Sequence, residues 1–159
     1  MATTSETDLE GPALEAWRSY LQSHASILRV LDADLAAEHG LTTRDYEALL
    51  YLAQAPDRRL PMSVLAEQTM LTRSGITRLV DGLVASGLIE RRACRSDARI
   101  SYASLTDAGY QKLRKAGSSH VASIRRLFLC QYTREEVEQL ADLLARLPGA
   151  TGQGRCAVD

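Results

Sequence analysis

The 159-residue chain has no apolar run that approaches the roughly 18 residues a helix needs to span a bilayer. Its acidic residues 1–12 also lack the basic and then apolar layout of a secretory signal peptide. Only three cysteines occur, an odd number, widely separated and without paired spacing: Cys94, Cys130 and Cys156. We therefore expect a soluble, cytoplasmic protein whose thiols are reduced.

The sequence also lacks the short motifs that carry most enzyme chemistry. It has no glycine-rich phosphate loop, nucleophile elbow, paired carboxylates or clustered His and Cys ligands. The candidate metal ligands are His24, Glu38, His39 and His120. None of them forms the i, i+4 pair or the clustered spacing that zinc sites show. We expect no catalytic residue, no metal and no cofactor, and an enzyme is disfavoured.

Aromatic residues are scarce, at 5% of the chain, whereas alanine and leucine are plentiful. The apolar residues recur mostly at helical rather than alternating spacing, which predicts a mostly α-helical protein. The length leaves room for one small domain with flanking helices.

Excess charge is small overall but unevenly distributed along the chain. The net charge is −1, which by itself argues against a nucleic-acid partner. From Arg58 to Arg99, however, eight arginines stand against four acids, so the rest of the chain carries −5. The basic part of the protein is therefore one segment, as expected of a nucleic-acid-binding unit.

The segment Leu71 to Leu105 begins with a helix start signal. The Thr72 hydroxyl can cap the first turn, while Leu71 packs on Ile76. The apolar residues of this helix recur at helical spacing and are Ile76, Leu79, Val80 and Leu83. Its other side carries Arg73, Ser74, Thr77, Arg78 and Asp81. One face therefore suits a core, and the other donates hydrogen bonds.

A β-hairpin is predicted after this helix. Gly87 is the expected left-handed C-cap, followed by the strand segments 88–92 and 100–105. The tip between them places Arg95 and Arg99 around Asp97. A helix of this kind fits the major groove of DNA, and a thin arginine-tipped hairpin can enter an adjacent minor groove. The pattern predicts a winged helix-turn-helix.

Four helix starts share one pattern, an apolar residue, a threonine, three residues and a second apolar residue. The threonines are Thr42, Thr72, Thr106 and Thr133. With the breakers between them, they predict helices at 13–38, 43–54, 62–69, 107–131 and 133–146, and an edge segment at 60–61. In the 62–69 helix and the turn after it, Val64, Leu65 and Met70 are expected to point inward.

The first helix carries a regular heptad seam. Its members are Trp17, Leu21, His24, Leu28, Leu31 and Leu35. This helix and the last two predicted helices have apolar stripes but lie outside the winged helix-turn-helix. We therefore expect them to bury these stripes against one another and against a second copy of the chain. The predicted organisation is a helical dimerisation region at 13–40 and 107–147, a winged helix-turn-helix at 41–106, and disordered tails at 1–12 and 148–159. Such a homodimer would face successive major grooves, about 34 Å apart, of a pseudo-palindromic double-stranded DNA site.

Several of these segments resemble the multiple-antibiotic-resistance regulator (MarR) family. The motifs that carry the resemblance are Leu65-Ala66-Glu67, Thr77-Arg78-Leu79-Val80-Asp81, Gly87-Leu88-Ile89-Glu90-Arg91, Asp97-x-Arg99 and Leu105-Thr106-Asp107-Ala108-Gly109. The resemblance covers about Ala13 to Leu147.

The resemblance implies a homodimeric transcriptional regulator, usually a repressor, that a small and often phenolic ligand or thiol oxidation releases from DNA. It assigns Arg73, Ser74, Thr77 and Arg78 to the major groove. It assigns Arg99 to the minor groove, with Asp97 steadying the wing. By analogy with the family's pockets, an effector cavity would be lined by Trp17, Tyr20, His24 and Tyr46.

Some assignments stay open at this point. Asp81 is expected to pair with a nearby arginine rather than touch DNA, because phosphates repel a carboxylate. A second group either contacts phosphates or forms a solvated basic rim: Arg58, Arg59, Arg91 and Arg92. Two other functions remain as alternatives, a thiol-redox regulator acting through Cys94 and a winged-helix module for protein contact.

Overall fold

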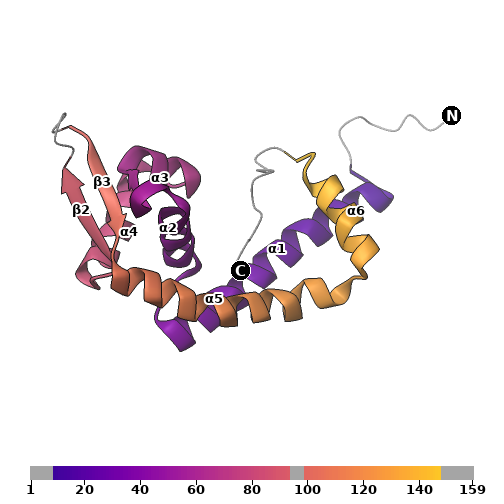
Figure 1. The fold of residues 1–159 in the computed structure, drawn as a ribbon. Helices are drawn as coiled ribbons and strands as arrows, with labels where there is room; N and C mark the ends of the chain where they lie inside the picture. Colours follow the sequence, from indigo (N-terminus) through magenta and orange to yellow (C-terminus); the bar gives the residue numbers. More distant parts are fainter. Residues whose placement is uncertain (1–8, 94–98, 148–159) are drawn as a thin grey trace. The chain divides into compact units, whose positions relative to one another are not determined.

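The computed structural model describes residues 9–93 and 99–147 (Figure 1). The chain divides into two compact units, Met1–Val121 and Ala122–Asp159. In chain order the elements are α1 (Gly11–His39), α2 (Thr43–Gln54), the 3-10 turn η1 (Pro56–Arg58), β1 (Arg59–Pro61), α3 (Met62–Gln68), α4 (Arg73–Ala85), β2 (Ile89–Ala93), β3 (Ser101–Leu105), α5 (Asp107–Leu127), the 3-10 turn η2 (Leu129–Gln131) and α6 (Arg134–Leu144). The mostly helical fold with a small hairpin is confirmed. No helix among the described residues is long and apolar enough to cross a membrane.

The four threonine caps act as predicted. The hydroxyl oxygens of Thr42, Thr72, Thr106 and Thr133 accept hydrogen bonds from the backbone amides of Asp45, Gly75, Gly109 and Glu136. At Thr42 and Thr133 the acid three residues later also accepts from the threonine amide, which completes a capping box. Each helix start is therefore set by its own first turn. Helix ends were harder to predict, since α5 stops at Leu127 and η2 occupies the segment that we had expected to extend it.

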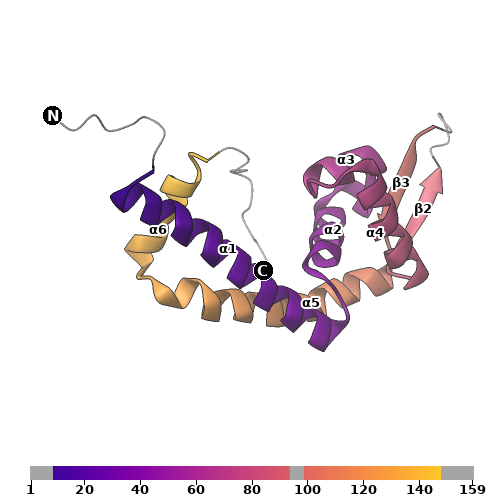
Figure 2. The same cartoon turned by 180° about the vertical axis from the view of Figure 1, so that it is seen from behind.

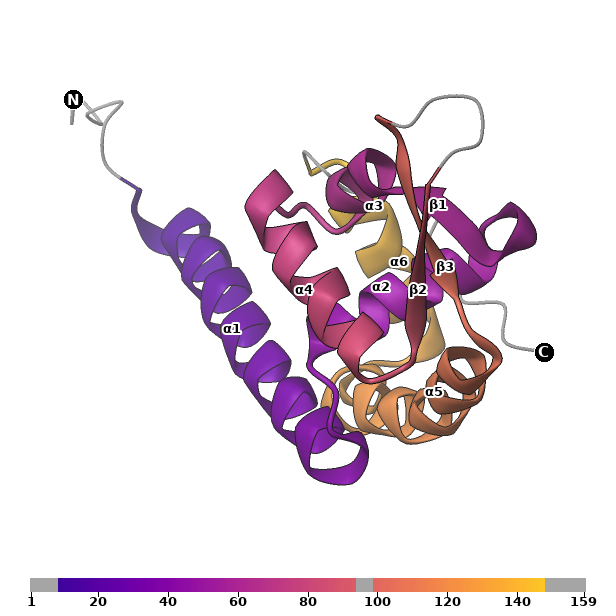
Figure 3. The ribbon, with the colours of Figure 1, turned by 90° about the vertical axis from the view of Figure 1, so that its left-hand side faces the viewer.

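The strands form a small antiparallel sheet in the order β1-β3-β2 (Figure 3). β2 and β3 make the predicted hairpin, with Ile89 opposite Leu105 and Ala93 opposite Ser101. β1 pairs on the other side of β3 and confirms the predicted edge segment. Gly87 has a φ of +72°, which is the left-handed conformation expected at the end of α4.

The core of the first unit lies where α2, α3 and α4 meet the sheet. Both α2 and α4 contact the hairpin, α2 through β3 and α4 through β2 (Figure 2). The fully buried side chains there are Leu49, Leu52, Leu65, Ile76, Val80 and Ile89. The predicted inward stripe of α4 is thus confirmed, because Ile76 and Val80 are no more than 1% exposed.

The heptad seam of α1 is divided between two environments. Leu31 and Leu35, near the end of the helix, are buried, and Leu35 belongs to the core of the first unit. The Asp32 carboxylate fixes the same end by accepting hydrogen bonds from the amide and hydroxyl of Thr43 at the start of α2. The earlier seam residues are exposed in the single chain: Trp17, Leu21, His24 and Leu28. The second half of the seam is therefore core, and the first half has no cover within this unit.

The prediction that Met70 points inward is wrong. Met70 is 79% exposed and has a φ of +52°. The chain must reverse between α3 and α4 at this residue, and the left-handed backbone that achieves the reversal turns the side chain outward. Thr69 is buried in its place, and its hydroxyl donates to the Leu65 carbonyl at 2.7 Å.

Replacing Met70 by glycine should stabilise the protein by about 1 kcal/mol. The left-handed conformation is costly for a residue with a Cβ and nearly free for glycine. The exposed methionine side chain loses little burial in return. Urea unfolding measures the change, and Gly87→Ala, at φ +72° with open space around it, is the reverse control and should destabilise by a similar amount. A destabilised Met70→Gly variant would show that the side chain makes contacts that outweigh the backbone strain.

The second unit contains the end of α5, η2 and α6. In it, α6 follows the Thr133 capping box, and Val137, Leu140 and Leu144 are half-buried. Leu143 and Leu147 are exposed, as is Tyr132 before the helix. No residue of α6 is buried, and this unit therefore also exposes apolar side chains.

Candidate nucleic-acid interface

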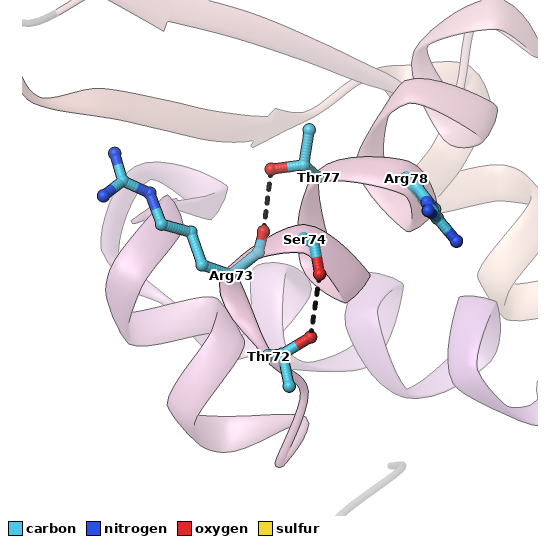
Figure 4. Close-up of a pocket in the computed structure, with 5 residues that line it drawn as sticks. All are labelled: Thr72, Arg73, Ser74, Thr77 and Arg78. Atoms are coloured by element: carbon cyan, nitrogen blue, oxygen red, sulfur yellow. Dashed lines mark hydrogen bonds between the residues drawn. The ribbon is translucent and has the colours of Figure 1, made fainter.

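The outer side of α4 forms an open concavity of about 560 Å³ (Figure 4). Its lining is Thr72, Arg73, Ser74, Thr77 and Arg78. The N-cap at Thr72 starts the helix here, and the buried stripe of Ile76 and Val80 turns these side chains outward. The structure thus brings together the four α4 residues that the sequence assigned to the major groove.

Hydrogen bonds within the concavity orient its hydroxyl groups. The Thr77 hydroxyl donates to the Arg73 carbonyl at 2.8 Å, and the Ser74 and Thr72 hydroxyl oxygens are 3.2 Å apart. Arg73 and Arg78 extend to opposite sides of the helix (Figure 4). The surface therefore offers two guanidinium groups separated by short polar side chains, a set of donors and acceptors suited to base edges and phosphates.

The hairpin carries a third basic residue. Arg99 is exposed, two residues before β3. Arg95, Asp97 and Cys94, which complete the predicted wing and the redox alternative, lie outside the described residues. Their assignments stay predictions.

Two arginines of the basic rim are held by carboxylates on other elements. Arg58 pairs with Asp107 at the start of α5 at 3.3 Å, and its guanidinium lies 3.9 Å from the centre of the Tyr110 ring. Arg91 of β2 pairs with Asp81 of α4 at 2.8 Å. The predicted pairing of Asp81 with an arginine is therefore confirmed.

The other two rim arginines form ion pairs only with residues close to them on the chain, among the pairs that the structure gives. Arg59 contacts Asp57 at 3.1 Å, and Arg92 contacts Glu90 at 3.0 Å, each two residues away. The Arg59 guanidinium also lies 5.8 Å from the centre of the Tyr102 ring of β3. Exposed pairs of this kind contribute at most about 1 kcal/mol. The rim thus divides into arginines that join elements and arginines that a phosphate could recruit at little cost.

The predicted effector residues belong to two different clusters. Trp17, Tyr20 and His24 form an exposed stack along α1, with ring centres 6.2 and 6.1 Å apart. Tyr46 is only 7% exposed and packs on the His120 ring of α5 at 4.5 Å. Burial lowers the pKa of His120, because desolvation penalises the charged imidazolium. Burial therefore favours the neutral form of His120.

In the described part of the chain, no three His, Cys, Asp or Glu side chains come together as a metal site would require. His39 instead contacts the Ser119 hydroxyl at 2.7 Å. This contact joins the end of α1 to α5.

Sequence reasoning missed the joint between α4 and α5. The Thr106 hydroxyl donates to the Gly87 carbonyl at 2.8 Å, and the Thr106 amide donates to the Leu88 carbonyl at 3.1 Å. The threonine was recognised as a cap for α5, but its link to the end of α4 depends on the hairpin that brings the two segments together. The glycine three residues later, inside a predicted helix, was the available signal.

Three comparisons with known proteins bear on this interface. The sequence model described as the MarR family matches residues 39–100. The chain is similar to AbsC, a MarR family transcriptional regulator from Streptomyces coelicolor, with 34% identity and a TM-score of 0.81, covering 86% of this chain and 92% of that one. It is also similar to Sco3205, a regulator of the same family and organism solved in complex with DNA, with 32% identity, a TM-score of 0.83 and 89% of both chains covered. A curated relative, the HTH-type transcriptional repressor YetL of Bacillus subtilis, is 29% identical, covering 88% of this chain and 85% of that protein.

Proposed function

The chain belongs to the MarR family of transcriptional regulators, and from this premise we propose that it is a homodimeric repressor that a small effector releases from a pseudo-palindromic DNA operator. In this proposal residues 41–106 form the DNA-binding winged helix-turn-helix. Residues 13–40 and 107–147 form the dimerisation region. The related Sco3205 structure, which contains DNA, supports the DNA-binding part of the proposal.

The observation that carries the proposal is the concavity on α4. A helix with a fully buried stripe and an outer face of arginine and hydroxyl side chains fits the major groove. Arg73 and Arg78 would each reach guanine edges or phosphates, and Ser74 and Thr77 would contact bases between them. Arg99 would enter the neighbouring minor groove.

Exposed apolar side chains support the homodimer. Trp17, Tyr20 and Leu21 on α1 are 44–50% exposed in the single chain, and Leu143 in the second unit is 52% exposed. Large exposed apolar patches on a folded domain usually mark an interface. A second copy related by a two-fold axis would cover both sets and set the spacing of two α4 helices.

Aromatic side chains near α1 support the effector part of the proposal. The stack of Trp17, Tyr20 and His24 offers faces on which an aromatic ligand would pack, and Tyr46 lies next to His120. A ligand that binds one dimer spacing better than another would shift the population away from the DNA-binding form.

Arg78→Ala should erase much of the preference of the protein for its own upstream DNA over a scrambled duplex. A bidentate arginine contact with guanine contributes about 1–3 kcal/mol of discrimination per half-site. Arg99→Ala should weaken binding and lower the salt dependence by about one unit of slope, since it removes one cation from the groove. Fluorescence anisotropy with both duplexes across a salt series measures both effects.

The control for these two variants is Arg134→Ala in α6, which removes an exposed arginine remote in sequence from α4 and the hairpin. It should leave the sequence preference unchanged. If wild-type protein binds neither duplex at low salt, the DNA-binding proposal fails. The exposed arginines would then favour the alternative of a winged-helix module for protein contact.

A further inference from the structure

Arg91 joins the stem of the hairpin to the middle of α4. Its Nη2 atom lies 2.8 Å from Asp81 Oδ1 and donates to the Thr77 carbonyl at 3.3 Å. Asp81 and Thr77 are one turn apart on α4, so one guanidinium spans a full turn of the helix. Two contacts at different points resist both sliding and rotation of the strand against the helix.

The register of the sheet explains why Arg91 reaches α4 and Arg92 does not. Successive side chains of a strand point to opposite faces, so Arg91 shares its face with Ile89, which is 1% exposed. The residue opposite Arg91 on β3 is Ala103, which is fully buried. Arg92 points to the other face, where it pairs with Glu90 of its own strand. The two adjacent arginines therefore have different neighbours.

The Asp81 side chain adds an electrostatic effect to the contact with Arg91. It is the one acid within α4, and its side chain is 63% exposed on the helix that carries the DNA-facing arginines. An unpaired carboxylate there would repel phosphates. The Arg91 guanidinium balances this charge and is held against α4 by both contacts.

We propose that Arg91 is a positioning residue that fixes the angle between α4 and the wing, which is the hairpin of β2 and β3. At this angle α4 and the wing engage the major and the minor groove at once. This inference rests on the proposed DNA-binding function. In a short two-stranded hairpin, the stem sets the direction of the tip, and β2 ends at Ala93, only two residues beyond Arg91. A loosened stem would let the wing swing away from the groove while leaving the base-reading face of α4 intact.

The test depends on whether removing the Asp81 charge strengthens or weakens DNA binding. Removing an acid from a surface that only attracts phosphates should strengthen DNA binding. If Asp81 anchors Arg91, Asp81→Asn should instead weaken operator binding by about fivefold, the equivalent of about 1 kcal/mol. Arg91→Met, which keeps the aliphatic stem, should weaken it similarly, and the double variant should be no worse than the weaker single. The exchanged pair, Asp81→Arg with Arg91→Asp, should restore most of the affinity.

The neighbouring pair provides the matched control. Glu90→Gln removes a carboxylate that is paired with an arginine, as Asp81→Asn does, but without touching α4. Glu90→Gln should leave binding unchanged or strengthen it. A second readout separates positioning from general destabilisation: Arg99→Ala should cost less affinity in the Arg91→Met background, because the wing is already misplaced. Urea unfolding of each variant measures folding in the absence of DNA.

Several outcomes would overturn the proposal. Tighter binding by Asp81→Asn, or additive losses for Asp81 and Arg91, would show that the pair does not position the wing. An undiminished effect of Arg99→Ala in the Arg91→Met background would have the same meaning. Wild-type protein that binds neither duplex would overturn the DNA-binding function itself, and the role of Arg91 with it. Wild-type binding with unaffected pair variants would overturn the positioning role alone.

Discussion

Gly109→Ala is expected to destabilise the first unit by about 3 kcal/mol, at the upper end of the usual cost of overpacking. A Cβ built on Gly109 would overlap the Leu88 carbonyl oxygen and lie 2.7 Å from Leu105 Cδ1. The first of these neighbours is backbone, so it cannot move aside as the end of a long side chain could. The first turn of α5 therefore fits against the start of the hairpin only without a side chain at this position.

The Leu88 carbonyl is also held from the other side. It accepts hydrogen bonds from the Thr106 amide and from the Thr106 hydroxyl, both at 3.1 Å. Relieving the overlap by shifting Leu88 would break these bonds, and shifting α5 would break the cap between Thr106 and the Gly109 amide. Each way of making room thus loses part of the joint between α4 and α5.

Urea unfolding monitored by circular dichroism measures the loss at Gly109. Gly82→Ala is the matched control, because a Cβ at Gly82 meets nothing within 4 Å. Gly82 lies in the interior of α4, so alanine there should stabilise the protein by about 0.5–1 kcal/mol. A Gly109→Ala variant as stable as wild type would mean that α5 and Leu88 are not in close contact in solution.

Leu21→Arg is expected to weaken the proposed dimer by at least about a hundredfold and to abolish tight operator binding. Leu21 is 45% exposed in the single chain, within the uncovered half of the α1 seam. A two-fold interface would bury two copies of the new charge without a partner, at a cost of several kcal/mol. The added positive charge should by itself favour DNA, so a loss of binding would have to come from the lost dimer.

Sedimentation equilibrium gives the dimer dissociation constant, and anisotropy with full and half operators gives the affinity for each. The variant should bind both duplexes with similar, weak affinity, because only one α4 helix can act at a time. Ser19→Arg, on an exposed position of α1 two residues from Trp17 and outside the heptad spacing, is the control and should remain dimeric. A dimeric Leu21→Arg protein would exclude this part of α1 from the interface.

The outer face of α4, which we propose contacts DNA, could be predicted from the sequence because it depends on one helix. The Thr72 cap fixes the start, and the period of 3.6 residues then assigns Ile76 and Val80 to the inside and Arg78 to the outside. The effector residues could not be grouped in the same way. Tyr46 packs on the His120 ring of α5, and the pattern of α2 alone does not indicate this contact.

The turn at Met70 shows where local reasoning failed. An apolar residue after Leu65 and Thr69 was expected to continue the buried side of α3, but the reversal into α4 requires a left-handed residue at this point. Hydrophobic periodicity holds only while the backbone stays helical. A single residue with positive φ changes the direction of the side chain and ends the pattern.

The sequence by itself determined the order of the elements, the four threonine caps, the hairpin and the two faces of α4, because each depends on interactions within a few residues of chain. The tertiary structure decided which arginines pair with another element and which pair only within their own strand. Arg91 and Arg92 are adjacent and look alike in sequence, yet the first is bound to α4 and the second only to its own strand. The difference arises because the alternation of a strand acquires meaning only when another element packs on one of its faces.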